Sequence, residues 1–255
     1  MKKPCGCRNP LQLPTIPGDF YRNMQFTLQS YSLPPPESLS GLASVLPANS
    51  SWAGGAISSS KGQLLGAEVQ AVAKAVAKRQ QEFRAGRVYA REALGALGFA
   101  DAEIPVGSAR QPLWPSGITG SITHQDDFCV AAVIQQEHVR LLGIDLASPE
   151  PLRPELHARI CNPQEIDYLR AIDQAPFDPF KLVFSMKESL FKCLYLDVGH
   201  YLGFHAVSVY PDFARDTAQV EIIDAALSAE IGRQTGIQAE FARLGDYIFT
   251  AAWVR

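Results

Sequence analysis

Near the middle of the C-terminal half lies the stretch Phe184-Ser185-Met186-Lys187-Glu188-Ser189-Leu190-Phe191-Lys192. It belongs to a run that opens with Asp178-Pro179 and closes at Gly199, so a helix is predicted with an N-cap, a first-turn proline and a terminating glycine. At about 100° per residue, polar and apolar side chains separate onto opposite sides of this helix. The polar stripe holds Lys181, Ser185, Glu188 and Lys192, and the apolar side holds Leu182, Val183, Met186, Leu190, Cys193 and Leu194.

Two interpretations of the polar stripe are open. It can be a solvated face on which Glu188 and Lys192 form an i,i+4 pair, which would contribute only about 0.3–0.5 kcal/mol. Alternatively, one carboxylate and two amines line a functional face. The motifs elsewhere in the chain distinguish these two interpretations.

The composition indicates a soluble globular protein. The chain has 255 residues, 47% of them hydrophobic, which suffices for one large domain or two small ones. A net charge of -3 gives no general reason to expect binding to nucleic acid or a membrane surface. We find no apolar membrane span and no secretion signal.

The five cysteines are odd in number, and most lie among apolar neighbours. This pattern favours reduced thiols and a cytoplasmic location over a disulfide framework. Cys5-Gly6-Cys7 is the one close pair, and it could bind a metal or be redox active, but no second Cys or His cluster follows it.

Residues 1–63 are rich in Pro, Ser and Gly and are expected to be loop-like and partly flexible, with one strand at Met24 to Leu28. From Leu64 to Leu97 the pattern is helical, with Arg79 on the apolar stripe and Arg87 on its edge. Arginine is seldom buried without a partner, so both guanidiniums need an anion, either a carboxylate such as Glu82 or a phosphate.

Two polar clusters follow beside apolar runs. Ser121, Thr123 and His124 precede the strand predicted at Phe128 to Ile134 and could donate hydrogen bonds to phosphate oxygens, although a lone His is more often structural. Asp145 lies inside the apolar strand 140–146, where its carboxylate must meet a cation, accept hydrogen bonds or ligate a metal.

Further strands are predicted at 205–210, 218–223 and 247–254. The segments 127–133 and 246–254 share one order of acid, aromatic and apolar residues, which hints at an internal duplication with a break near residue 140. We therefore expect an N-terminal region over 1–63 and two halves over 64–140 and 141–255, with a ligand in the cleft between the halves.

The ordered blocks 78–87, 110–115, 120–124, 143–145 and 184–192 resemble the signature of the 4'-phosphopantetheinyl transferases, most closely the siderophore-synthetase branch of the enterobactin synthetase component D type. The resemblance implies an α+β fold of two pseudo-symmetric helix-plus-antiparallel-sheet halves. It also implies an enzyme that moves the phosphopantetheine arm of coenzyme A onto a serine of an apo acyl or peptidyl carrier protein. Adenosine 3',5'-bisphosphate would be released, and we expect a monomer serving siderophore or other secondary-metabolite synthesis.

The resemblance also assigns residues. Asp145 and Glu188 would supply the carboxylates of a Mg²⁺ site, with Mn²⁺ accepted as well. Lys192 would neutralise charge on the diphosphate, and Glu188 or a metal-bound water would take the serine proton. The expected coenzyme A ligands are Arg79, Arg87, Arg110, Thr123, His124, Lys187 and Lys192, although Lys187 lies toward the apolar side of its helix.

One position departs from the family pattern, because Ala147 stands where a second acid is usual. A water could fill that place, Glu150 could reach in, or the metal could be held weakly. Two other functions therefore stay open. The chain could be a coenzyme A-binding protein without transferase activity, or a non-catalytic docking partner of a synthetase.

Overall fold

A computed structural model describes residues 36–198, 202–230 and 236–255. All described residues belong to one compact unit. The strand expected at Met24 to Leu28, the Cys5/Cys7 pair and Gly199 lie outside the described residues. Within the described ranges, no helix is long and apolar enough to cross a membrane.

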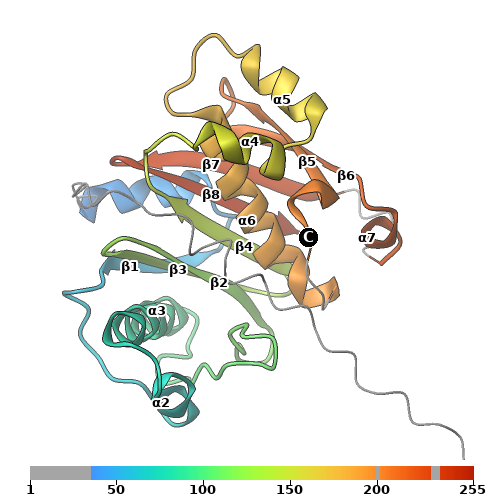
Figure 1. Ribbon diagram of the computed structural model, residues 1–255. Helices are drawn as coiled ribbons and strands as arrows, with labels where there is room; N and C mark the ends of the chain where they lie inside the picture. The colour runs from blue at the N-terminus through green and yellow to red at the C-terminus, as the bar shows by residue number, and fades with distance from the viewer. Residues whose placement is uncertain (1–35, 199–201, 231–235) are drawn as a thin grey trace, which may run out of the picture. The chain divides into compact units, whose positions relative to one another are not determined.

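The N-terminal half is a three-stranded antiparallel sheet with a long helix on one face (Figure 1). After the 3-10 helix η1 (Pro36–Ser44), the strands are β1 (Ser51–Ala56), β2 (Ile118–Gln125) and β3 (Phe128–Gln135), in the order β1-β3-β2. The helices are α2 (Ala67–Val72) and α3 (Ala77–Gly95). Ala85, Tyr89 and Ala93 of α3 pack on Cys129, Ala131 and Val133 of β3.

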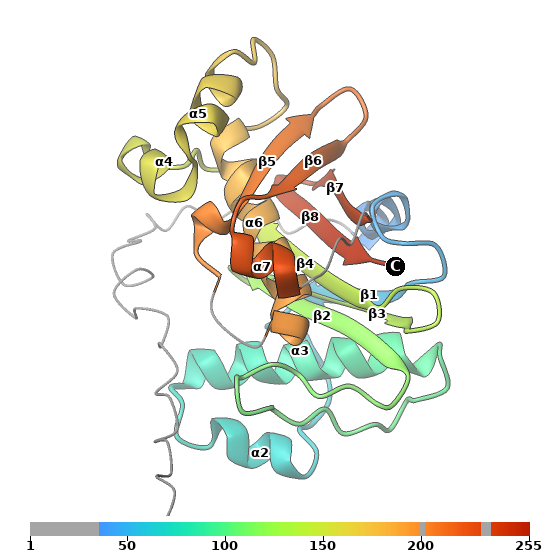
Figure 2. The same cartoon turned by 90° about the vertical axis from the view of Figure 1, so that its right-hand side faces the viewer.

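The C-terminal half is a five-stranded antiparallel sheet in the order β4-β8-β7-β6-β5. Its strands are β4 (Leu141–Ala147), β5 (Val207–Asp212), β6 (Thr217–Ile222), β7 (Ile237–Leu244) and β8 (Tyr247–Val254). The helices of this half are α4 (Pro154–Ile160), α5 (Pro163–Arg170), α6 (Pro179–Val198), η2 (Phe204–Ala206) and α7 (Ala225–Glu230). Figure 2 shows α4 and α5 beside β5, where the Asn162 amide donates to the Ser208 hydroxyl at 2.7 Å.

The two sheets pack face to face around one apolar core. Even-numbered residues of β3 (128–134) and of β4 (142–146) meet there with alternate residues of β8, and Leu42 of η1 closes the side. Because strand side chains alternate, the odd-numbered residues of β4 face the other way, toward α6. The expected α+β fold of two helix-plus-antiparallel-sheet halves is therefore confirmed.

Helix α6 begins at the residue that the sequence predicted, and its apolar side is buried. The Asp178 side chain accepts from the Lys181 amide at 3.1 Å, and all of the predicted apolar side is 0–1% exposed. A Cβ at Gly143 would collide with the Ser189 carbonyl, so β4 and α6 approach backbone to backbone. The polar stripe is not the solvated face considered above, because Lys181 is 5% and Ser185 0% exposed.

Two sequence predictions in the N-terminal half were wrong. The helical pattern of 64–97 is broken at residues 73–76, where the Gln80 side chain binds the Val72 and Ala75 carbonyls and helix α3 restarts with Val76 as N-cap. The apolar stripe predicted for an unbroken helix includes Val69 and Val76, but both are exposed because the restart changes the helical phase. Strand β1 also forms where only loop was expected, because its backbone pairs with β3.

Candidate functional site

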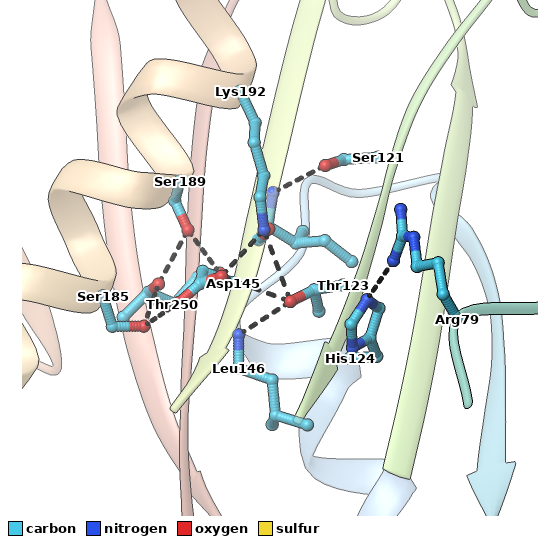
Figure 3. Close-up of polar contacts among 11 residues, drawn as sticks. Arg79, Ser121, Thr123, His124, Asp145, Leu146, Ser185, Ser189, Lys192 and Thr250 are labelled. Atoms are coloured by element: carbon cyan, nitrogen blue, oxygen red, sulfur yellow. Dashed lines mark hydrogen bonds and ion pairs between the residues drawn. The ribbon is translucent and has the colours of Figure 1, made fainter. Parts of the chain in front are cut away.

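The site begins where the edges of the two sheets meet. β2 and β4 are edge strands of different sheets, and an edge strand leaves backbone groups without a partner. The Ile144 amide donates to the Ser121 hydroxyl and the Leu146 amide to the Thr123 hydroxyl, both at 3.1 Å (Figure 3). These two buried hydroxyls therefore join the halves of the chain.

Asp145 lies at this junction with its side chain turned toward α6. Its Oδ1 accepts from the Lys192 ammonium at 2.7 Å and from the Thr123 hydroxyl at 3.2 Å, and its Oδ2 accepts from the Ser185 hydroxyl at 2.8 Å. The Lys192 ammonium also donates to the Ile144 carbonyl at 2.9 Å. Asp145 is only 9% exposed, so this cation and these hydroxyls provide the compensation that a buried carboxylate requires.

The position of Glu188 follows from the contacts of its neighbours on α6. Ser189 faces Thr250 of β8, Ser185 faces both Thr250 and Asp145, and Lys192 faces Asp145 and Thr123. At about 100° per residue, Ser189, Ser185 and Lys192 follow one another around the helix, from the side of β8 to the side of β2. Glu188 is the next position after Lys192 in that direction. Its side chain therefore projects from the β2 side of α6, and it is partly exposed.

Arg79 and His124 extend the polar row onto the N-terminal half. The Arg79 guanidinium donates to His124 Nε2 at 3.0 Å and lies 3.3 Å from Glu82 (Figure 3). Burial lowers the pKa of His124. The cations Arg79 and Lys192 also lower it, whereas the carboxylates of Glu82 and Asp145 raise it. A neutral ring whose Nε2 accepts from Arg79 carries its proton on Nδ1.

Arg87 and Arg110 lie apart from this row. Arg87 is 5% exposed, donates from Nε to the Ile104 carbonyl at 2.8 Å and lies 4.3 Å over the Phe83 ring. Burial lowers the pKa of its guanidinium to about 10. Arg110 is exposed in the loop after Gly107, with a positive φ of 68°. The two guanidiniums were expected to point toward the interior or a cleft; Arg87 is buried in the interior, whereas the Arg79 side chain is 53% exposed.

Lys187 points away from Asp145 and is held inside the C-terminal half. Its ammonium donates to Glu165 and to the Ile160 and Phe204 carbonyls, each at 2.8 Å. Its side chain is 1% and that of Glu165 0% exposed. Burial lowers the pKa of Lys187, and Glu165 opposes that shift. These contacts use all three ammonium protons to connect α6 with α4, α5 and η2.

Models of one protein family match both halves of the chain. The 4'-phosphopantetheinyl transferase N-terminal domain matches residues 67–134, and the 4'-phosphopantetheinyl transferase superfamily matches residues 141–252. The chain belongs to the 4'-phosphopantetheinyl transferase superfamily.

Curated members of the superfamily are similar over the same region. The chain is 38% identical to 4'-phosphopantetheinyl transferase Svp of Streptomyces mobaraensis, over 60% of this chain and 64% of that protein. It is 35% identical to Npt of Nocardia iowensis, over 56% and 64% of the two chains. Enterobactin synthase component D of Escherichia coli is 35% identical over 51% of this chain and 63% of that protein. Each match spans less than two thirds of the relative's length.

The carboxylate of Asp145 has an acceptor position that could bind a magnesium ion. Mg²⁺ is usually bound by one or two carboxylates, and waters and substrate phosphates complete its shell. A carboxylate offers about four acceptor positions; the Asp145 contacts use three and leave one on Oδ2. Among the described residues, no three His, Cys, Asp or Glu side chains gather as a metal site. The donors therefore fit an open site completed by substrate oxygens rather than a closed cage.

The position of Ala147 limits this site. Ala147 shares the α6-facing side of β4 with Asp145 and is 3% exposed, so no carboxylate is available there. Lys181 of the polar stripe on α6 is also buried. Burial lowers its pKa, while Glu150 and then Asp145 raise it. Glu150, three residues after Ala147, is thus within electrostatic range of an ammonium that Asp145 also influences.

Proposed function

We propose that this chain transfers the 4'-phosphopantetheine arm of coenzyme A to a serine of an apo carrier protein. One observation carries the proposal: Lys192 of α6 binds Asp145 of β4 and Thr123 of β2, so a cation, a carboxylate and a hydroxyl meet where the two halves join. Membership of the superfamily supports the same conclusion.

In this proposal the N-terminal half binds the nucleotide end of coenzyme A. The Arg79 guanidinium, 53% exposed, has donors left for a phosphate after it contacts His124 and Glu82. The His124 Nδ1 proton is available as a further donor if Nε2 accepts from Arg79. Arg110 is exposed and can approach a phosphate, whereas Arg87 supports the site through its packing against Phe83.

The C-terminal half supplies the groups for the transfer. A cation held by Asp145 and Glu188, Mg²⁺ or Mn²⁺, would neutralise charge on the coenzyme A diphosphate. The Lys192 ammonium, 28% exposed, is the chain's own positive charge beside that diphosphate. The serine oxygen of the carrier protein bonds to the pantetheine-side phosphorus, and Glu188 accepts the proton that this oxygen loses. The bond from that phosphorus to adenosine 3',5'-bisphosphate then breaks.

The test is the mass of a carrier protein. We would incubate the chain with coenzyme A, Mg²⁺ and a panel of apo acyl and peptidyl carrier proteins, and measure intact masses. The proposal expects at least one carrier to gain a single 4'-phosphopantetheine group, and no gain with EDTA. The carriers that react would also test our further proposal of siderophore or other secondary-metabolite synthesis, which the identity to enterobactin synthase component D supports.

A second candidate function is coenzyme A binding without transfer. The observation in its favour is Ala147, because the loss of an acid weakens a metal site more than it weakens a phosphate site. If calorimetry shows coenzyme A binding while no carrier in the panel gains mass, this second function is favoured.

A further inference from the structure

Three buried hydroxyl groups form a chain behind Asp145. Ser185 and Ser189 of α6 and Thr250 of β8 are each 0% exposed. The Ser185 hydroxyl lies 3.0 Å from the Thr250 hydroxyl, which lies 2.7 Å from the Ser189 hydroxyl (Figure 3). The Ser185 hydroxyl also reaches Asp145 Oδ2 at 2.8 Å. The hydroxyl chain therefore runs Ser189, Thr250, Ser185 and ends on the carboxylate.

The direction of these hydrogen bonds follows from the number of protons. An ionised carboxylate only accepts, so the single proton of Ser185 is donated to Asp145. The contact between Ser185 and Thr250 then requires Thr250 as the donor. The Ser189 hydroxyl donates to the Thr250 carbonyl at 3.0 Å and shares that single proton with the Thr250 hydroxyl at 2.7 Å. Thr250 thus donates to Ser185 and Ser185 to Asp145, and donors aligned in this way polarise one another.

The same proton count identifies the hydroxyl that donates to Asp145 Oδ1. Thr123 Oγ1 accepts from the Leu146 amide at 3.1 Å and from the Lys192 ammonium at 3.4 Å. Its own proton is therefore donated to Asp145 Oδ1 at 3.2 Å. One hydroxyl holds each oxygen of the carboxylate, and the carboxylate plane is set by β2 on one side and by α6 and β8 on the other.

We infer that the Ser189–Thr250–Ser185 hydroxyl chain positions Asp145 for the cation of the transfer reaction. This inference rests on the proposed function, since the cation belongs to it. Hydrogen bonds that orient a metal ligand from behind are worth about 10–100-fold in metal affinity. The hydroxyls touch neither substrate nor cation, so they are positioning residues, and cation affinity is the property they should change.

The test compares variants that keep the shape of the side chain. Thr250→Val replaces a hydroxyl by a methyl group and breaks the hydroxyl chain, whereas Thr250→Ser keeps the hydroxyl and loses the methyl group. A matched control is Thr119→Val on β2, because Thr119 is 1% exposed and its hydroxyl has no hydrogen-bond partner among the described residues. Mn²⁺ binding would be measured by electron paramagnetic resonance at saturating coenzyme A.

The inference expects Thr250→Val to bind Mn²⁺ roughly tenfold more weakly than the parent. Thr250→Ser and Thr119→Val should bind it like the parent. Parent-like binding by Thr250→Val would overturn the inference, and so would equal weakening in Thr250→Ser, which would assign the effect to packing of the methyl group. If Thr250→Val does not fold, Ser189→Ala replaces it, with weaker Mn²⁺ binding expected and parent-like binding contradicting the inference.

The same titration separates this inference from the proposed function. A parent chain that binds Mn²⁺, together with an Asp145→Asn variant that does not, supports the cation site whatever the hydroxyl variants do. A parent chain that binds no Mn²⁺ overturns the cation site and this inference together. Unchanged affinity in the hydroxyl variants alone overturns only the inference.

Discussion

Replacing Lys187 by Met should destabilise the fold more than the same change at Lys192. Lys187 and Glu165 are 1% and 0% exposed, so solvent does not screen their interaction. Removal of the ammonium leaves the Glu165 charge buried, supported within the described part of the chain by the Asn162 and Val209 amides at 2.8 Å. Breaking a buried pair from one side typically costs about 3–5 kcal/mol. Lys192 is 28% exposed, and Asp145 keeps the Thr123 and Ser185 hydroxyls after its loss, so the cost should be smaller, about 1–3 kcal/mol.

Urea unfolding followed by circular dichroism measures both free energies. The cost of Lys187→Met should shrink when Glu165→Gln is added, because the double variant no longer buries a lone charge. A loss below about 1 kcal/mol for Lys187→Met would refute the structural assignment of this pair. It would favour the role of Lys187 as a coenzyme A ligand that the family resemblance implies.

Further predictions concern the ends of the polar row. Arg79→Ala should weaken binding of coenzyme A more than of dephospho-coenzyme A, measured by calorimetry, and equal weakening would favour a purely structural pair with Glu82. Burial lowers the pKa of His124, so the unfolded chain binds the proton more tightly. Stability should therefore fall as the pH drops below about 6.5, and His124→Gln should flatten this dependence in urea titrations; an unchanged slope would contradict the shift. Ala147→Glu should lower the Mg²⁺ concentration needed for transfer, yet unfold more easily in EDTA because Ala147 is only 3% exposed. An unchanged Mg²⁺ dependence would mean that this position does not face the cation.

Local signals in the sequence predicted the helix that carries the site. The start of α6 follows from Asp178-Pro179, and its polar and apolar sides follow from spacing alone. The sequence also required a partner for Asp145, because a buried carboxylate is costly. The identity of the partners was not predicted, since Lys192, Thr123 and Ser185 come from segments distant in the sequence from Asp145.

Other elements depend on long-range contacts and were missed or misplaced. β1 has the sequence SWAGGA, which carries little strand preference, and its pairing with β3 determines its conformation. Arg79 and Arg87 both lie on α3, so helical spacing alone did not distinguish the buried Arg87 from Arg79, whose side chain is 53% exposed. β7 is different, because the alternation of Ile237, Ala239 and Phe241 with polar residues is a strand signal in the sequence itself.

The central claim is that the residues around Asp145 transfer 4'-phosphopantetheine with Glu188 as an essential carboxylate. Its most direct test is the intact mass of an apo carrier protein incubated with coenzyme A, saturating Mg²⁺ and either the parent chain or Glu188→Gln. Glu188 is partly exposed, so the variant should keep the parent's unfolding midpoint. We predict that the parent adds one 4'-phosphopantetheine group and that Glu188→Gln adds none. Near-parent transfer by Glu188→Gln would contradict the account.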